Sequence, residues 1–448
     1  MLKRLCLTLA LLIATPLLWA QGDSNGNEPA SPLVDSTMLT PPPVSGRSYP
    51  TALGSEERSN FLRYGLSFTS AYSDNALGGS TPVSDVSYSV SPTIALDQKT
   101  STIHTVLTYA PGFTFYQRTT SRDEADQNVS INITDRLSPH VTLSAQDGLQ
   151  KSSSVFNQLD YGSGGVSGGA GGGNSPIVAP ISPFLNNRGT VGVSYQFAAN
   201  AMIGASGTFT NLHYFNSTEV SGLADGTSQS GSVYYSIRAS RLHYFGVSYE
   251  YQRLVSSSPT IGESETQTDA IHFFYTLYPT SRISASVFGG PLHSNTTEGA
   301  LGGLPLPAAV AWNPSIGGSF SWSGDLTNAA FGYSHTISGG GGLSGAVHSD
   351  SANVSVHRRI TRSLDGSFSG AYAGNKLIGN PLFGGSNNGH SISATGSLSK
   401  QLGEHIGLQI GYSRVHQDYS YVEVLAATPT VNREFVSLSY TFSRPLGR

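Results

Sequence analysis

Residues 241–253 decide the fold, and they read Arg-Leu-His-Tyr-Phe-Gly-Val-Ser-Tyr-Glu-Tyr-Gln-Arg. Large apolar or aromatic residues alternate here with small or polar ones: Phe245, Val247, Tyr249 and Tyr251 against Gly246, Ser248, Glu250 and Gln252. Successive side chains of a β-strand point to opposite faces of the sheet. The stretch therefore predicts a strand with one face in an apolar medium and the other in water.

The same alternation recurs along most of the chain, for example at 62–69, 190–197, 404–413 and 436–442. We predict about 18 strands (16–18), of the length that a tilted transmembrane strand needs. They lie near 62–72, 84–95, 102–116, 126–135, 138–150, 188–198, 201–213, 230–240, 241–254, 267–278, 281–293, 309–322, 325–338, 349–358, 361–373, 388–400, 403–416 and 432–443.

The connections between these strands alternate between short and long. Short ones include 97–101, 135–139 and 198–200, and long ones include 151–187 and 256–265. Outer-membrane barrels have short periplasmic turns and long extracellular loops. The sequence thus predicts an all-β protein, a transmembrane antiparallel up-and-down β-barrel. Secreted β-domains or a β-solenoid are the alternatives, but their solvent face normally carries many charges.

The composition agrees with an outer-membrane location. The 448 residues include 24 Lys and Arg against 28 Asp and Glu, so that only 12% are charged, and 10% are aromatic. A cytosolic enzyme has about 25% charged residues, and disordered chains are depleted in aromatics. The acidic balance also argues against nucleic acid as a partner.

The chain divides into three parts. Residues 1–20 carry Lys3 and Arg4, an apolar run from Leu5 to Leu18 and a small residue at Ala20 for cleavage, which is typical of a signal peptide. The single cysteine, Cys6, lies within it. Residues 21–60 are rich in proline and predict a disordered periplasmic linker. Residues 61–448 form the predicted barrel.

Sequence motifs for catalysis are weak. Residues 165–169 match Gly-x-Ser-x-Gly, but they lie inside a glycine run with no readable strand before them or helix after them. The 12 histidines show no metal-binding spacing. We therefore expect no enzyme activity, metal or cofactor.

Two sets of residues are candidates for controlling permeation. The longest connection, 151–187, contains Ile177, Val178, Ile181, Phe184 and Leu185, and could enter the lumen as a constriction loop or pack outside it. The inward face of the strands carries candidates for ion selectivity, which could instead anchor turns: Arg63, Arg238, Glu250, Gln252 and Gln409.

These patterns favour an outer-membrane channel for small polar solutes or saccharides, because neutral hydroxyls and amides hydrogen-bond to sugars without trapping ions. A plugged barrel that displays its loops for surface binding or adhesion is the alternative.

Two short motifs resemble those of known barrels. The last strand, with Tyr440 and Phe442, resembles the C-terminal assembly signal of outer-membrane proteins. Ala71-Tyr72-Ser73-Asp74-Asn75-Ala76 resembles the opening of porin-like barrels linked to exopolysaccharide export. The resemblance implies a channel whose partners are outer-membrane lipid, the barrel-assembly machinery, and polysaccharide or polysaccharide-export proteins.

Overall fold

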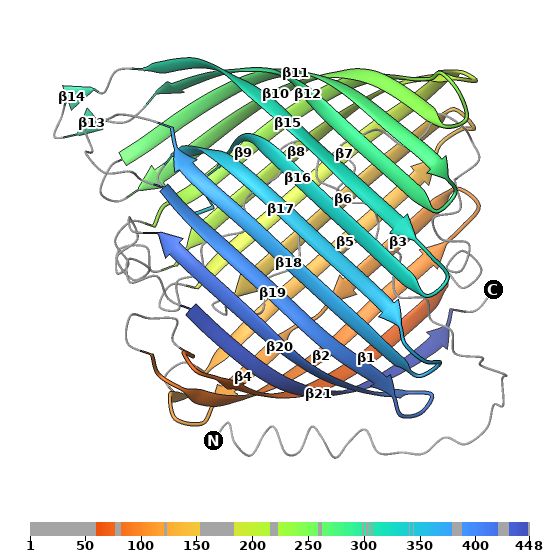
Figure 1. Cartoon of the computed structure of the whole chain (residues 1–448), viewed down its shortest axis with the longest axis vertical. Helices are drawn as coiled ribbons and strands as arrows, with labels where there is room; N and C mark the ends of the chain where they lie inside the picture. The colour runs from red at the N-terminus through yellow and green to blue at the C-terminus, as the bar shows by residue number, and fades with distance from the viewer. Residues whose placement is uncertain are drawn as a thin grey trace.

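The computed structural model describes residues 60–76, 82–120, 123–152, 183–215, 223–258, 262–297, 300–301, 304–305, 308–339, 341–343, 345–378, 388–419 and 430–446. The predicted signal peptide and nearly all of the predicted linker lie outside the described residues. Figure 1 shows the strands winding into one tilted barrel.

The strands have the following bounds. They are β1 (Phe61–Ser73), β2 (Asp85–Lys99), β3 (Ile103–Tyr109), β4 (Gly112–Tyr116), β5 (Glu124–Arg136), β6 (Val141–Ser152), β7 (Phe184–Ala198), β8 (Ala201–Tyr214), β9 (Asp225–Arg238), β10 (His243–Ser258), β11 (Gly262–Thr280), β12 (Ile283–Thr297), β13 (Ala300–Leu301), β14 (Leu304–Pro305), β15 (Ala309–Ser323), β16 (Thr327–Gly339), β17 (Ala346–Arg359), β18 (Leu364–Leu377), β19 (Asn388–Gln401), β20 (Ile406–Tyr419) and β21 (Thr430–Pro445).

Eighteen strands make the wall, which confirms the predicted fold class. The main sheet has 19 segments, but β3 and β4 are two halves of one strand, since both pair with β2 and with β5. The break between them contains Pro111, which has no N–H to give to a neighbouring strand. Strands β13 and β14 form a separate hairpin.

The barrel closes where β1 pairs with β21, from Phe61↔Pro445 to Ser73↔Arg433. At one end of this junction Asn60, with φ of 97°, accepts from the backbone N–H groups of Lys99 and Leu446. At the other end the carboxylate of Asp74 accepts from the backbone and side-chain N–H groups of Asn432, at 2.8 and 2.6 Å. The first and last strands are thus joined at one end by the backbone bond between Asn60 and Leu446, and at the other end by the Asp74 carboxylate.

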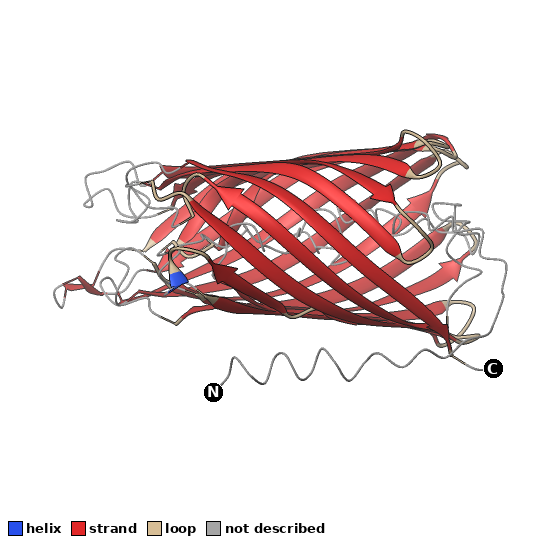
Figure 2. Cartoon of the chain, turned by 90° about the horizontal axis from the view of Figure 1, so that it is seen from below, coloured by secondary structure: helices blue, strands red, loops and turns tan. Residues whose placement is uncertain are grey.

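The outer face of the wall is apolar, as the alternation predicts. Side chains such as Leu66, Val191, Phe273 and Ile410 are exposed on it, and Phe273 keeps 64% of its surface accessible. Figure 2 shows that strands alone make this wall. A closed sheet with an apolar exterior meets lipid outside and, apart from one stretch described below, satisfies its backbone internally, as a bilayer requires. The chain is therefore an outer-membrane β-barrel.

No helix among the described residues is long and apolar enough to cross a membrane.

Short turns gather at one end of the barrel, on the right in Figure 1, and the strand ends that longer connections join lie at the other. We assign the first end to the periplasm. One predicted long loop is wrong: most of 256–265 is strand, because β10 runs to Ser258 and β11 begins at Gly262. Alternation persists there, with Ser256, Ser258 and Ser264 buried, and Arg253 binds Glu265 across the two strands at 2.7 Å.

One line of the wall departs from continuous pairing. Strand β15 pairs with β16 only between Ser323↔Asn328 and Ile316↔His335. Towards the extracellular end β15 continues beside β12, and β16 continues beside β17 as far as Gly339↔Ala346. We call this unpaired stretch, residues 309–315 of β15 and 336–339 of β16, the seam.

Candidate functional site: a lumenal constriction

Pairs of hydroxyl groups line the inner face of the barrel. They lie on neighbouring strands with oxygen–oxygen distances of 2.5–3.2 Å: Thr69–Ser437, Ser89–Thr114, Thr190–Thr208, Ser206–Ser232, Thr266–Thr296, Thr276–Ser286, Ser284–Ser321, Ser334–Ser351, Ser367–Ser397 and Thr395–Ser413. Such cross-strand pairs stabilise the sheet and satisfy polar groups that face inward. They explain why small hydroxyl residues fill the polar half of the alternation.

Inward-facing aromatic rings lie close against the wall. A Cβ atom on Gly246 would stand 2.1 Å from the ring of Phe274, its direct partner on β11. Four more rings cover a directly paired glycine in the same way: Tyr234 over Gly204, Phe288 over Gly317, Tyr419 over Gly389, and Phe435 over Gly411. The glycines thus make room for rings that would otherwise extend into the lumen.

A polar patch lies on the inner face of β7 to β10. Asn186 and Arg188 of β7 are buried there, and so are Glu250 and Gln252 of β10. The side chain of Gln252 donates to the hydroxyl of Ser228 at 3.1 Å. The patch places a guanidinium and a carboxyl group on the same lumenal wall.

A hairpin end reaches over the intervening strands to this patch. We call residues 336–339, 341–343 and 345–347, which end β16 and begin β17, the lumenal tip. Although β11, β12 and β15 separate β10 from β16 in the wall, β16 contacts both β9 and β10, and β17 contacts β11. The tip therefore lies inside the barrel, where it narrows the lumen.

Hydrogen bonds dock the tip on the inner side of the wall at β8 to β10. The Tyr214 hydroxyl donates to the Gly341 carbonyl at 3.0 Å, and the Ala224 N–H donates to the Gly342 carbonyl at 2.8 Å. The Ser256 hydroxyl donates to the Leu343 carbonyl and accepts from the Gly345 N–H, at 3.3 and 3.0 Å. Backbone groups that left the wall thus find new partners on β8 to β10.

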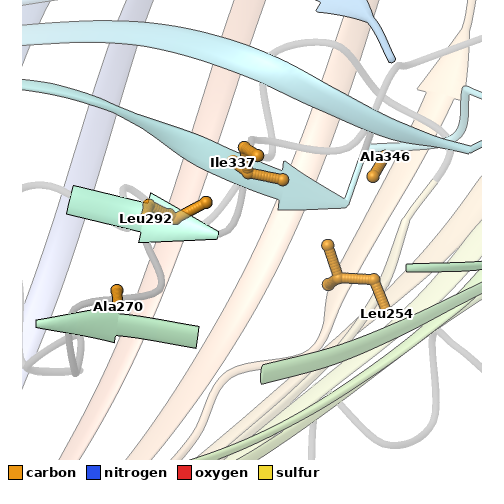
Figure 3. Close-up of a cluster of buried hydrophobic side chains, with 5 residues drawn as sticks. All are labelled: Leu254, Ala270, Leu292, Ile337 and Ala346. Atoms are coloured by element: carbon orange, nitrogen blue, oxygen red, sulfur yellow. The ribbon is translucent and has the colours of Figure 1, made fainter. Parts of the chain in front are cut away.

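An apolar cluster supports the docked position. Leu254, Ala270 and Leu292 come from β10, β11 and β12, whereas Ile337 and Ala346 come from the tip, and all five are at most 4% exposed. Figure 3 shows these side chains gathered in the space between the hairpin and the opposing strands. Removing Ile337 from water contributes about 1.5–3 kcal/mol towards docking.

A cavity of about 80 Å³ remains between the tip and the wall. Its lining combines both kinds of surface: Arg188, Thr208 and Gln252 on the polar side, and Leu254 and Leu343 on the apolar side. This constriction is our candidate functional site, because here the tip and the polar patch lie on two sides of one cavity.

The permeation candidates from the sequence occupy different places. Glu250 and Gln252 belong to the polar patch, and Gln252 also lines the cavity. Arg63 and Arg238 lie near the periplasmic ends of β1 and β9. Gln409 of β20 donates to Ser397 at 2.9 Å.

The predicted constriction loop is described only in part. Phe184 and Leu185 begin β7, where Phe184 is fully buried against the ring of Tyr214 and Leu185 is less buried. Ile177, Val178 and Ile181 lie outside the described residues. Tyr440 and Phe442, the predicted assembly signal, are exposed on the outer face of β21, and both rings contact His405.

Sequence reasoning missed the lumenal tip and Arg188. The signal available for the tip was the glycine-rich run at 339–345 between two predicted strands. It contains Gly342, whose φ is 116°. A Cβ atom added there would stand 2.4 Å from the Tyr214 hydroxyl oxygen, which leaves no place for it. Among the described residues, no group of three or more His, Cys, Asp or Glu is arranged to hold a metal ion.

No protein-family model matches this chain, and no curated protein matches it. Solved structures similar to it include two outer-membrane proteins. OccK2 (OpdF) of Pseudomonas aeruginosa is 12% identical, with 87% of this chain and 100% of that chain covered and a TM-score of 0.41. OccAB4 of Acinetobacter baumannii is 9% identical, with 87% and 100% covered and a TM-score of 0.38.

The unliganded ferric citrate transporter FecA is also similar. It is 10% identical, with 84% of this chain and 63% of that chain covered and a TM-score of 0.41.

Proposed function

We propose that this protein is an outer-membrane channel that conducts small polar solutes through a hydroxyl-lined lumen. The observation that carries the proposal is the inner face itself, where Ser and Thr pairs recur around the barrel and a docked hairpin tip narrows the passage. Neutral hydroxyls exchange hydrogen bonds with a hydrated solute at little cost. A barrel of this size encloses an aqueous lumen unless something plugs it.

Saccharides are the proposed class of solute. Sugar hydroxyls match the donors and acceptors of the paired Ser and Thr side chains, and Arg188 with Gln252 at the cavity adds stronger hydrogen-bonding groups. The likeness of residues 71–76 to barrels linked to exopolysaccharide export supports a longer glycan as well. In that role, polysaccharide-export proteins would be the periplasmic partners.

Single-channel recording in planar bilayers tests the proposal. Refolded protein, verified as a barrel by heat-modifiable migration, should give steady conductance steps, and added maltodextrin should block them transiently. Deleting residues 162–182, which leaves β7 intact, tests the predicted constriction loop, since a loop inside the lumen predicts larger steps without it.

The plugged barrel predicts silence from both the full and the deleted protein. That outcome, from protein shown to be folded, would overturn the channel and favour the display of loops for surface binding.

A further inference from the structure

The seam is unusual because both of its strands continue past the point where they part. Within the described residues, β15 loses β16 as a partner after Ile316↔His335, yet residues 309–315 stay paired with β12. Strand β16 likewise stays paired with β17. One line of the wall is thus open at its extracellular half, and the strand end that would fill it lies in the lumen as part of the lumenal tip.

A proline explains where the strands part. Pro314 of β15 stands directly opposite Pro291 of β12, and neither residue has an N–H. The two cannot form a hydrogen-bonded pair, so their backbone nitrogens face the other neighbours, β16 and β11. Pairing lapses at both places: β11 and β12 skip from Ala270↔Leu292 to Phe273↔Gly289, and β15 and β16 stop at Ile316.

The sequences of the parted strands still match one another. Extending the register from Ile316↔His335 would place Ser315 opposite Thr336 and Asn313 opposite Ser338 on the inner face. Both are polar pairs of the kind that line the rest of the lumen. The same register would place Ile337 on the outer face beside Pro314, in line with Tyr333 and Ile316. The two strands therefore retain the pattern of a complete wall.

The docked position leaves a polar group without a partner. The Ser338 hydroxyl is buried, with 1% of the residue exposed, and has no hydrogen-bond partner in the described structure. A buried hydroxyl without a hydrogen-bond partner destabilises the docked position. In the extended register it would face the amide of Asn313.

We propose that the lumenal tip is a gate with two positions: docked on β8 to β10, where it narrows the lumen, and zipped to β15, where it completes the wall. Four hydrogen bonds and the apolar cluster stabilise the docked position. Backbone hydrogen bonds to β15 would stabilise the zipped position. Pro314 biases the gate towards docking, because it leaves the zipped ladder one N–H short. That the tip gates transport rests on the proposed channel function, whereas the existence of two tip positions does not.

Disulfide trapping tests the geometry. In a Cys6→Ser background, Asn313→Cys with Ser338→Cys reports the zipped position, and Ser315→Cys with Thr336→Cys is a second reporter. Ser256→Cys with Leu343→Cys, joined by a short thiol cross-linker, holds the docked position. Ser334→Cys with Ser351→Cys is the control, because these hydroxyls are 2.7 Å apart on two strands that move together.

We expect both zipped reporters to cross-link. Pro314→Ala should raise their yield about fivefold, the shift in population that one restored backbone hydrogen bond supports. Pro291→Ala is the matched control, since its nitrogen faces β11, and it should leave the yield unchanged. If neither reporter cross-links in any background while the control pair does, the tip has one position and the inference is overturned.

Conductance then tests the role. Protein trapped with the zipped reporter should show larger steps than protein held docked. Equal steps in the two trapped forms would overturn the gate even where cross-linking demonstrates movement. If both forms are silent, the channel proposal fails, and the cross-linking yields still decide whether the tip has two positions.

Discussion

At the scale of single residues, close contacts identify positions where the fold does not tolerate a substitution. Gly342 has a left-handed φ and lies against the Tyr214 hydroxyl, so that only glycine fits between the tip and β8. Asp74 has a different role, because its two oxygens bind Asn432 where the first and last strands meet. Each position leads to a substitution with a matched control.

Gly342→Ala should undock the lumenal tip. The added methyl meets the Tyr214 hydroxyl at 2.4 Å and strains the backbone at φ of 116°, so the docked position loses stability. Larger conductance steps or longer open times are expected in planar bilayers. Gly231→Ala, where no atom lies within 4 Å of the new methyl, should behave as the parent protein does. Unchanged conductance in Gly342→Ala would contradict docking at this residue.

Asp74→Ala should weaken closure of the barrel. It removes two hydrogen bonds to a carboxylate and leaves the Asn432 side chain without that acceptor, at a cost of about 2 kcal/mol. The urea concentration at half-unfolding, followed by heat-modifiable migration, should fall. Asp325→Ala removes an exposed ion pair with Arg282 and should change it little. Equal effects of the two substitutions would show that Asp74 does not hold the junction.

At the scale of elements, the alternation of side chains predicts the strands but not the path of the β16–β17 hairpin. Phe331, Tyr333, His335 and Ile337 keep one parity, so sequence alone places Ile337 on the outer face. The structure buries Ile337 inside, because β16 has left β15 by that point. Contacts across a lumen join residues that no local period relates, which is why strand existence was predictable and the constriction was not.

Two prolines mark irregularities of the strands that the alternation of side chains does not predict. Pro111 divides one strand into β3 and β4, and Pro314 stands where β15 and β16 part. A proline removes one hydrogen bond to a neighbouring strand; at Pro111 the strand is interrupted, whereas β15 continues through Pro314 and only its pairing with β16 ends. Which neighbouring strand loses the hydrogen bond depends on the register, and the sequence of a single strand does not determine the register.

Ile337→Ser should release the hairpin without disturbing its neighbours in the wall. The substitution removes the largest tip side chain from the apolar cluster and costs the docked position about 2 kcal/mol. Limited proteolysis at the tip should become faster while heat-modifiable migration stays unchanged. Val354→Ser on the outer face of β17 serves as control and should leave the tip as resistant as before. Equal resistance in Ile337→Ser would mean that the hydrogen bonds alone hold the tip.

At the scale of the whole molecule, charged side chains lie at different depths of the barrel. Arg188 is buried at the constriction, where low dielectric strengthens its effect on a passing ion. Arg282, at a short turn, pairs with Asp325 on the exposed rim. Comparing the two arginines therefore distinguishes the effect of a charge inside the barrel from that of a charge on its rim.

Arg188→Gln should shift the channel towards cations. Reversal potentials under a salt gradient measure this directly, and the ratio of cation to anion permeability should rise several-fold. Arg282→Gln should leave the ratio near that of the parent protein, because rim charges are screened by salt. A ratio that moves equally in both variants would remove Arg188 from the passage.

The partnered hydroxyls of the inner face bear on speed of transport. Thr190 with Thr208, or Ser367 with Ser397, already exchange a hydrogen bond with each other. Each such pair still offers one O–H donor and free lone pairs to a solute, and these neutral groups exchange readily between solute and water. For the proposed channel this predicts low affinity along the wall, short residence times, and a flux that follows the concentration gradient without saturating at a tight binding step.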